Sequence, residues 1–142
     1  WRVYVFADAA SPRAEDSKVA AWAKAIEEDP RSFRNRHTPS DGPEDACFDI
    51  KVVYQQKQTE FAHPDVPSIF RPTTGSLGLH DLNNIFATCR PTHGEDIFEA
   101  RGISRDGAVV VVRPDQYVSG VFGLDEVDRL NAFFAGVLLD AN

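Results

Sequence analysis

The amino-acid sequence predicts a single α/β domain, residues 1–142, in which a central mixed sheet carries a C-terminal β-hairpin and flanking helices. Segments with the two-residue period of strands alternate with segments of helical period, and two strand-like segments near the end flank a clear turn. At 142 residues, 42% of them hydrophobic and 26% charged, the chain has the size and composition of one globular domain.

The first third of the chain is typical of a strand, a helix and a second strand. Residues 2–7 are rich in aromatic and β-branched side chains, which favours a strand. The helix is predicted by an apolar stripe that Pro30 ends: Val19, Trp22, Ala23 and Ile26. A polar loop spans residues 31–45. The second strand is predicted by apolar residues at alternate positions: Phe48, Ile50, Val52 and Tyr54.

In residues 55–80 the apolar residues follow neither the helical nor the strand period, and the segment is rich in proline and glycine. Loops of this length are uncommon in compact domains unless they have a function. We therefore predict that the apolar residues of this segment form an interface, either with another part of a longer chain or with a second subunit: Val66, Ile69, Phe70, Leu77 and Leu79. The alternative is that the segment packs against this domain's own sheet.

The C-terminal part ends on a hairpin and a helix. Asp81 is predicted to cap a short helix that runs to Phe86. Residues 108–112 and 117–122 are predicted to form an antiparallel hairpin across a type I turn, with a structural role for Arg113, Pro114, Asp115 and Tyr117. A turn at residues 105–107 leads into the hairpin. The final helix follows Asp125 and is predicted by an apolar stripe: Val127, Leu130, Phe134, Val137 and Leu138.

The net charge argues against two classes of partner. A formal charge of −7, with no run of basic residues to offset it, repels nucleic-acid phosphates and anionic lipid headgroups. Even the longest apolar runs, such as residues 108–112, are far shorter than the roughly 20 residues that span a bilayer. We expect neither a nucleic-acid partner nor a membrane partner.

The predicted order of elements is that of a thioredoxin-like fold, but its redox motif is absent. Redox chemistry in that fold needs a cysteine just after the first strand, and residues 8–17 contain none. Cys47 and Cys89 are interpreted as free thiols of a cytoplasmic protein. A free-standing redox protein that uses one of these two cysteines is kept as an alternative.

No catalytic, cofactor-binding or metal-binding residue is predicted. Cys89 and His93 are four positions apart, but neither His63 nor His80 supplies a second pair with the spacing of zinc ligands. Acidic clusters lie at predicted helix ends or in loops, where solvated carboxylates are ordinary. Glycine-rich phosphate-binding motifs and nucleophile motifs are missing from the sequence.

The last third of the chain resembles a known family. Residues 101–118, and most specifically the run Arg-Pro-Asp-Gln-Tyr-Val from Arg113 to Val118, are similar to the C-terminal domain of the phenol 2-monooxygenase and 3-hydroxybenzoate 4-monooxygenase family of flavin hydroxylases. The upstream segments 48–56, 71–72 and 77–81 are similar to the same family, in the same order.

The resemblance implies a non-catalytic structural domain associated with dimerisation. The parent enzyme would use FAD and NAD(P)H to hydroxylate phenolic rings, with its flavin and substrate domains outside this chain. We therefore expect a fragment whose partners are the remainder of the parent hydroxylase and a second subunit, with no cofactor bound by the chain itself. A further alternative is a small module that binds an aromatic ligand through Trp1, Trp22, Phe70 and Tyr117.

Overall fold

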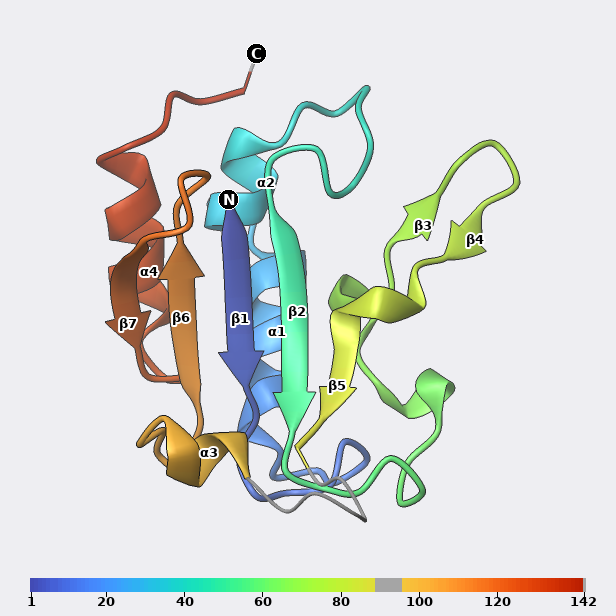
Figure 1. The fold of residues 1–142 in the computed structure, drawn as a ribbon. Helices are drawn as coiled ribbons and strands as arrows, with labels where there is room; N and C mark the ends of the chain where they lie inside the picture. The colour runs from blue at the N-terminus through green and yellow to red at the C-terminus, as the bar shows by residue number, and fades with distance from the viewer. Residues whose placement is uncertain (89–95, 142) are drawn as a thin grey trace.

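The computed structural model describes residues 1–88 and 96–141, which form a mixed α/β domain (Figure 1). Its five-stranded sheet has the order β5-β2-β1-β6-β7. Strand β1 is parallel to β2, β2 is parallel to β5, and the hairpin strands β6 and β7 run antiparallel to their neighbours. The sheet strands are β1 (Arg2–Phe6), β2 (Asp49–Tyr54), β5 (Ile85–Ala87), β6 (Ala108–Val112) and β7 (Val118–Phe122).

Four helices accompany the sheet in the described residues: α1 (Lys18–Glu28), α2 (Phe33–His37), α3 (Ile97–Ala100) and α4 (Val127–Ala135). The structure confirms the helical stripe of α1, because all four predicted residues are buried. Ser17 begins α1 by accepting a hydrogen bond from the backbone N–H of Ala20. The short helix α2 lies in the segment predicted as a loop; its signal was Ser32, whose hydroxyl accepts from the N–H of Asn35.

The predicted helix from Asp81 to Phe86 is wrong. Asp81 does cap a helical turn, but that turn is the single 3₁₀ turn η3 (Leu82–Asn84). The chain then extends as β5 and pairs in parallel with β2, so Phe86 belongs to the sheet. Partners in another strand decide the structure of a three-residue segment more strongly than its own sequence pattern does.

The main core lies between one face of the sheet and the helices α1, α2 and α4. The sheet contributes Val3, Val5, Val52 and Val111, and the helices contribute Trp22, Phe33 and Phe134. A second, smaller cluster lies on the opposite face, where Phe98 of α3 packs against Phe6 and Val53. The rings of Phe6 and Phe98 meet edge to face with centroids 5.5 Å apart.

The structure corrects the predicted interface for three of its five residues. Val66, Ile69 and Phe70 lie around the 3₁₀ turns η1 (His63–Asp65) and η2 (Ser68–Phe70) and are buried in the domain's own core. The Phe70 ring stacks on Trp22 at 6.1 Å, and the Ser68 hydroxyl donates to Glu27 of α1. Prolines limit the freedom of this segment, which packs against α1. Its apolar residues are therefore buried within the domain and need no second protein to cover them.

Leu77 and Leu79 are placed differently from the other three. They belong to a two-stranded arm, residues 73–80, formed by β3 (Thr73–Thr74) and β4 (Leu79–His80), which projects away from the main sheet (Figure 1). Their exposed fractions are 82% and 64%. An interface through these two residues therefore stays a prediction.

The predicted hairpin is present and its turn is well defined. The N–H of Gln116 donates to the carbonyl of Arg113, and the N–H of Arg113 donates to the carbonyl of Tyr117, both at 2.9 Å. Asp115 pairs with the Arg113 guanidinium. Gln116 closes the loop at a φ of 71°, a left-handed conformation that normally favours glycine.

Replacing Gln116 with glycine is therefore expected to stabilise the hairpin. The left-handed conformation costs a non-glycine residue about 1–2 kcal/mol, and the greater freedom of glycine in the unfolded chain offsets part of that gain. We expect the free energy of unfolding in urea to rise by about 0.5 kcal/mol for Gln116→Gly. The control Gln116→Ala keeps the strain and should leave stability unchanged. A loss of stability in Gln116→Gly would contradict this description of the turn.

Candidate functional site: an open face of the sheet

Residues 1–88 and 96–141 cover the face of the sheet opposite α1 only in part. The connection from β2 to β6 contains the four-residue helix α3, which packs on this face. It covers the C-terminal ends of β1 and β2. Mixed and parallel sheets in α/β proteins are usually covered by helices on both faces. The remaining part of this face is therefore available to a partner.

The uncovered part of the face is apolar on the hairpin side. Val110 pairs with Val121, and Val112 pairs with Val118, so these four side chains lie in two adjacent rows. We call Val110, Val112, Val118 and Val121 the valine surface. Val118 and Val121 are each 61% exposed, and Tyr4 extends the row of Val110 and Val121 onto β1 by pairing with Val110.

Charged residues flank the valine surface on the β1–β2 side. Asp49 of β2 accepts ion pairs from Arg2 at 3.2 Å and from Lys51 at 2.8 Å. Lys51 also donates to the side-chain oxygen of Asn84 at 2.7 Å. These charges are satisfied within the domain, so the apolar strip is the part of the face that gains most from being covered.

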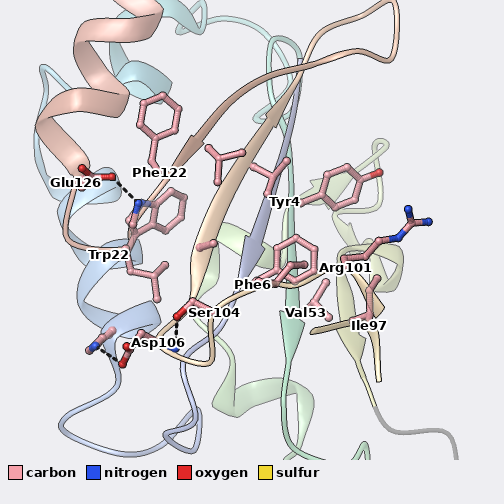
Figure 2. Close-up of a pocket in the computed structure, with 18 of the residues that line it drawn as sticks. Tyr4, Phe6, Trp22, Val53, Ile97, Arg101, Ser104, Asp106, Phe122 and Glu126 are labelled. Carbon is pink, nitrogen blue, oxygen red and sulfur yellow. Dashed lines mark hydrogen bonds and ion pairs between the residues drawn. The ribbon is translucent and has the colours of Figure 1, made fainter. Parts of the chain in front are cut away.

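A hollow of about 1810 Å³ runs over this face and continues round the edge of the sheet to α1 and the start of α4 (Figure 2). Figure 2 shows Tyr4, Phe6 and Val53 on one side of the hairpin, and Trp22, Phe122 and Glu126 on the other. Pockets for small molecules usually have volumes of about 300–1,000 Å³ and enclose most of the ligand. The size and shape of this hollow therefore suit a macromolecular surface better than a small ligand.

Two charged groups at the hollow, Lys18 and Glu126, are held by hydrogen bonds within the domain. A hydrogen bond from Lys18 to Asp106 raises the pKa of Lys18, and a hydrogen bond from the N–H of Gly123 lowers the pKa of Glu126. Both shifts favour the charged form at neutral pH. A general acid or base needs a pKa that is moved towards the working pH, and neither residue has one.

Asp96 anchors α3 to the end of the sheet. Burial raises the pKa of Asp96, but hydrogen bonds from Thr88, Arg105 and the N–H of Phe98 outweigh burial, so the net pKa is lowered. The Arg105 guanidinium lies 5.1 Å from the centre of the Phe98 ring. Asp96 thus stays ionised and holds the cap of α3, which is a structural role.

Residues 8–17, in which no redox cysteine is present, lead into the capped N-terminus of α1. The buried carboxylate of Asp8 follows β1 and accepts a hydrogen bond from the N–H of Val19 at 3.1 Å. Cys47 is a partly buried free thiol next to the start of β2, and its carbonyl accepts a hydrogen bond from the backbone nitrogen of Trp1. Cys89 and His93 lie outside the described residues. Among residues 1–88 and 96–141, His, Cys, Asp and Glu form no group of three that could hold a metal ion.

The residues of the aromatic-ligand alternative do not meet at one site. Trp22 and Phe70 stack on each other within the core, whereas Trp1 packs against Phe134 of α4 with ring centroids 5.5 Å apart. Tyr117 lies at the end of the hairpin and is 71% exposed.

In the part of the chain that the structure describes, no helix is both long and apolar enough to cross a membrane.

The family described as "Phenol hydroxylase, C-terminal dimerisation domain" matches residues 1–142. The chain belongs to this family. Among its relatives is a 3-hydroxybenzoate 4-monooxygenase from Comamonas testosteroni, 39% identical over 135 residues, which covers 94% of this chain and 21% of the relative.

Two fungal relatives of this dimerisation-domain family are more distant. An FAD-dependent monooxygenase from Aspergillus terreus, terD, is 27% identical over 94% of this chain and 22% of its own length. A second FAD-dependent monooxygenase, ankC from Aspergillus thermomutatus, is 30% identical over 61% of this chain and 14% of its own length. The chain thus spans about a fifth or less of the length of the curated relatives it matches.

The valine surface was missed from the sequence, although a signal was present. Residues 108–112 are apolar without interruption, whereas a strand with one face in water alternates apolar and polar residues. An unbroken apolar strand indicates that both faces are meant to be covered. The helix α3 was also unrecognised, because its single turn carries no period that a sequence pattern would reveal.

Proposed function

We propose that this chain is a non-catalytic structural and dimerisation domain of a larger FAD- and NAD(P)H-dependent monooxygenase that hydroxylates phenolic compounds. The observation that carries this proposal is the match of the family along the whole chain. The relative from Comamonas testosteroni is named for hydroxylation of a phenolic acid, and the two fungal relatives are named as FAD-dependent monooxygenases. We propose further that the domain contacts both a second subunit and the remainder of its own hydroxylase, and that the hydroxylase is located in the cytoplasm.

We assign a thioredoxin-like fold to the domain, as one unit from residue 1 to residue 142. The sheet order β2-β1-β6-β7, the parallel β1-α1-β2 unit and the final hairpin followed by α4 support this assignment. The stretch from Asp8 to Ser17, where the fold carries its redox cysteine, has none. The domain therefore retains the scaffold without the thiol chemistry.

The residues at the N-terminus of α1 do not fit a flavin dinucleotide. A pyrophosphate is usually bound at the N-terminus of a helix that follows a glycine-rich turn. At the N-terminus of α1, Asp8 and Ser17 already accept the hydrogen bonds of the backbone N–H groups of Val19 and Ala20. The Asp8 carboxylate would also repel a phosphate group there. We therefore place both FAD and NAD(P)H on the parent protein outside this chain.

The test compares purified residues 1–142 with the full-length protein that contains them. The chain alone is expected to be colourless and inactive, whereas the full-length protein should show the visible absorbance of a flavin and oxidise NAD(P)H when a phenol is added. Flavin that stays with residues 1–142 through gel filtration would contradict the proposal. A full-length protein that holds no flavin would do so as well.

For the arm, we propose a contact with the remainder of the hydroxylase or with a second subunit. Leu77 and Leu79 are the residues that carry this proposal, because their side chains are exposed at the tip of an ordered hairpin. Gly75 and Gly78 adopt left-handed φ values of 68° and 60°, which close the tip and hold Leu77 outward.

A further inference from the structure

Strand β7 ends the sheet; its pairing with β6 has one register shift, between Val111 and Val112, but it lacks the charges and proline that usually protect an edge strand. Soluble proteins protect exposed edges with lysine, proline, inward charges or a covering segment, because a free edge pairs readily with another strand. The sequence of β7, Val-Ser-Gly-Val-Phe from Val118 to Phe122, holds no charge and no proline. Figure 1 shows β7 as the outermost strand on the hairpin side. This edge is therefore competent to pair with a strand of another chain.

The valine surface reaches this same edge. Val118 and Val121 are exposed on β7, and their partners Val112 and Val110 continue the two apolar rows inward on β6. A second sheet added at β7 would extend both rows across the junction without interruption. Pairing at the edge and covering of the apolar rows would thus occur together, which is what a stable interface requires.

The charges near the two ends of β7 permit a second copy to approach. Arg113 pairs with Asp115 before the strand, and Arg129 pairs with Glu126 after it. Two copies of a chain with net charge −7 repel each other, so the uncharged strand β7 is a favourable place of contact. In an antiparallel arrangement each neutral pair would face a neutral pair of the other copy.

We propose that β7 of one chain pairs antiparallel with β7 of a second copy about a two-fold axis, which joins the two sheets and the two valine surfaces into one interface. The inference rests on the proposed dimerisation function and names the surface that carries it. A second copy is the occupant because an antiparallel strand pair is self-complementary, as a two-fold dimer demands, and because the family is described as a dimerisation domain.

The first test compares two double variants of the full-length protein by sedimentation equilibrium. Val118→Lys with Val121→Lys places charges on the proposed interface, and Val137→Lys with Leu139→Lys is the matched control after α4, at exposed apolar residues. The β7 variant is expected to raise the dimer dissociation constant by at least about 100-fold. The control variant at Val137 and Leu139 should leave this constant unchanged.

The outcomes separate the two proposals. A wild-type protein that is monomeric would overturn the dimerisation function and this inference with it. A wild-type dimer that the β7 variant leaves intact would overturn the β7 inference alone. A β7 variant that stays dimeric but loses flavin would show that the flavin-bearing part of the chain covers the valine surface, which also overturns the inference.

A second test detects the symmetry directly and does not depend on disrupting the fold. Val118→Cys, Ser119→Cys and Val121→Cys are made one at a time in the full-length protein. A residue on the two-fold axis faces its own copy with Cβ atoms about 4.5–5.5 Å apart, and the shorter of these spacings approaches the separation that a disulfide spans. We expect one of these positions to give an oxidised covalent dimer that the unsubstituted protein does not give. A wild-type dimer in which none of the three crosslinks would contradict the strand pairing.

Discussion

Phe70→Ala is expected to lower the free energy of unfolding by about 3–5 kcal/mol. The Phe70 side chain is fully buried, stacks on Trp22 and closes the core between η2 and α1. Its removal leaves a cavity that the stiff, proline-rich segment around it fills poorly. The measurement is urea denaturation of residues 1–142, followed by tryptophan fluorescence.

Leu77→Ala is the matched control for Phe70→Ala. Leu77 lies in the same segment of sequence but is 82% exposed, so its replacement should change stability by no more than about 0.5 kcal/mol. Equal effects of the two substitutions would contradict the division of this segment into a core part and an exposed arm. If Phe70→Ala weakened assembly without lowering stability, the original interface prediction for Phe70 would be restored.

Gly107→Ala is expected to destabilise the domain by about 2–5 kcal/mol. Gly107 has a φ of 92° at the turn that leads into β6, and its N–H donates to the carbonyl of Ser104. A Cβ atom there would lie 2.3 Å from a methyl carbon of Leu124 and 2.8 Å from the carbonyl oxygen of Phe6. Because one of these contacts is with the backbone of β1, the sheet itself would have to shift.

Gly102→Ala separates the two causes of that effect. Gly102 has a φ of 62°, but no heavy atom lies within 4 Å of the place its Cβ would take. This variant should therefore show the conformational cost alone, about 1–2 kcal/mol. If the two variants lost the same stability by thermal and urea unfolding, close packing at the start of β6 would not be the reason for glycine at position 107.

The sequence predicted the elements whose signals are local and long. The stripe of α1, the alternation of β2 and the hairpin were confirmed. The final helix was confirmed in part: α4 begins at Val127 after Glu126 and ends at Ala135, so Val137 and Leu138 of the predicted stripe lie beyond it, and Val137 is exposed. The turn at residues 105–107 was confirmed as well. For these elements, the spacing of the apolar residues predicts which face is buried.

The middle of the chain could not be predicted in the same way. Phe86 extends as a strand because β2 lies beside it, and Val66 is buried because α1 lies beneath its segment, so both depend on contacts distant in sequence. The candidate site depends on how much of the sheet is covered: in the described residues of the connection from β2 to β6, α3 is the helix that packs on that face. A pattern of residues does not show how much of a sheet a long connection will cover.

The central claim is that this domain holds two copies of the hydroxylase together. Sedimentation velocity of the full-length protein, compared with a version that lacks residues 1–142, tests it most directly. We predict that the full-length protein sediments as a dimer and that the shortened version sediments as a monomer while it retains its flavin. A shortened, flavin-bound protein that remains a dimer would contradict the claim.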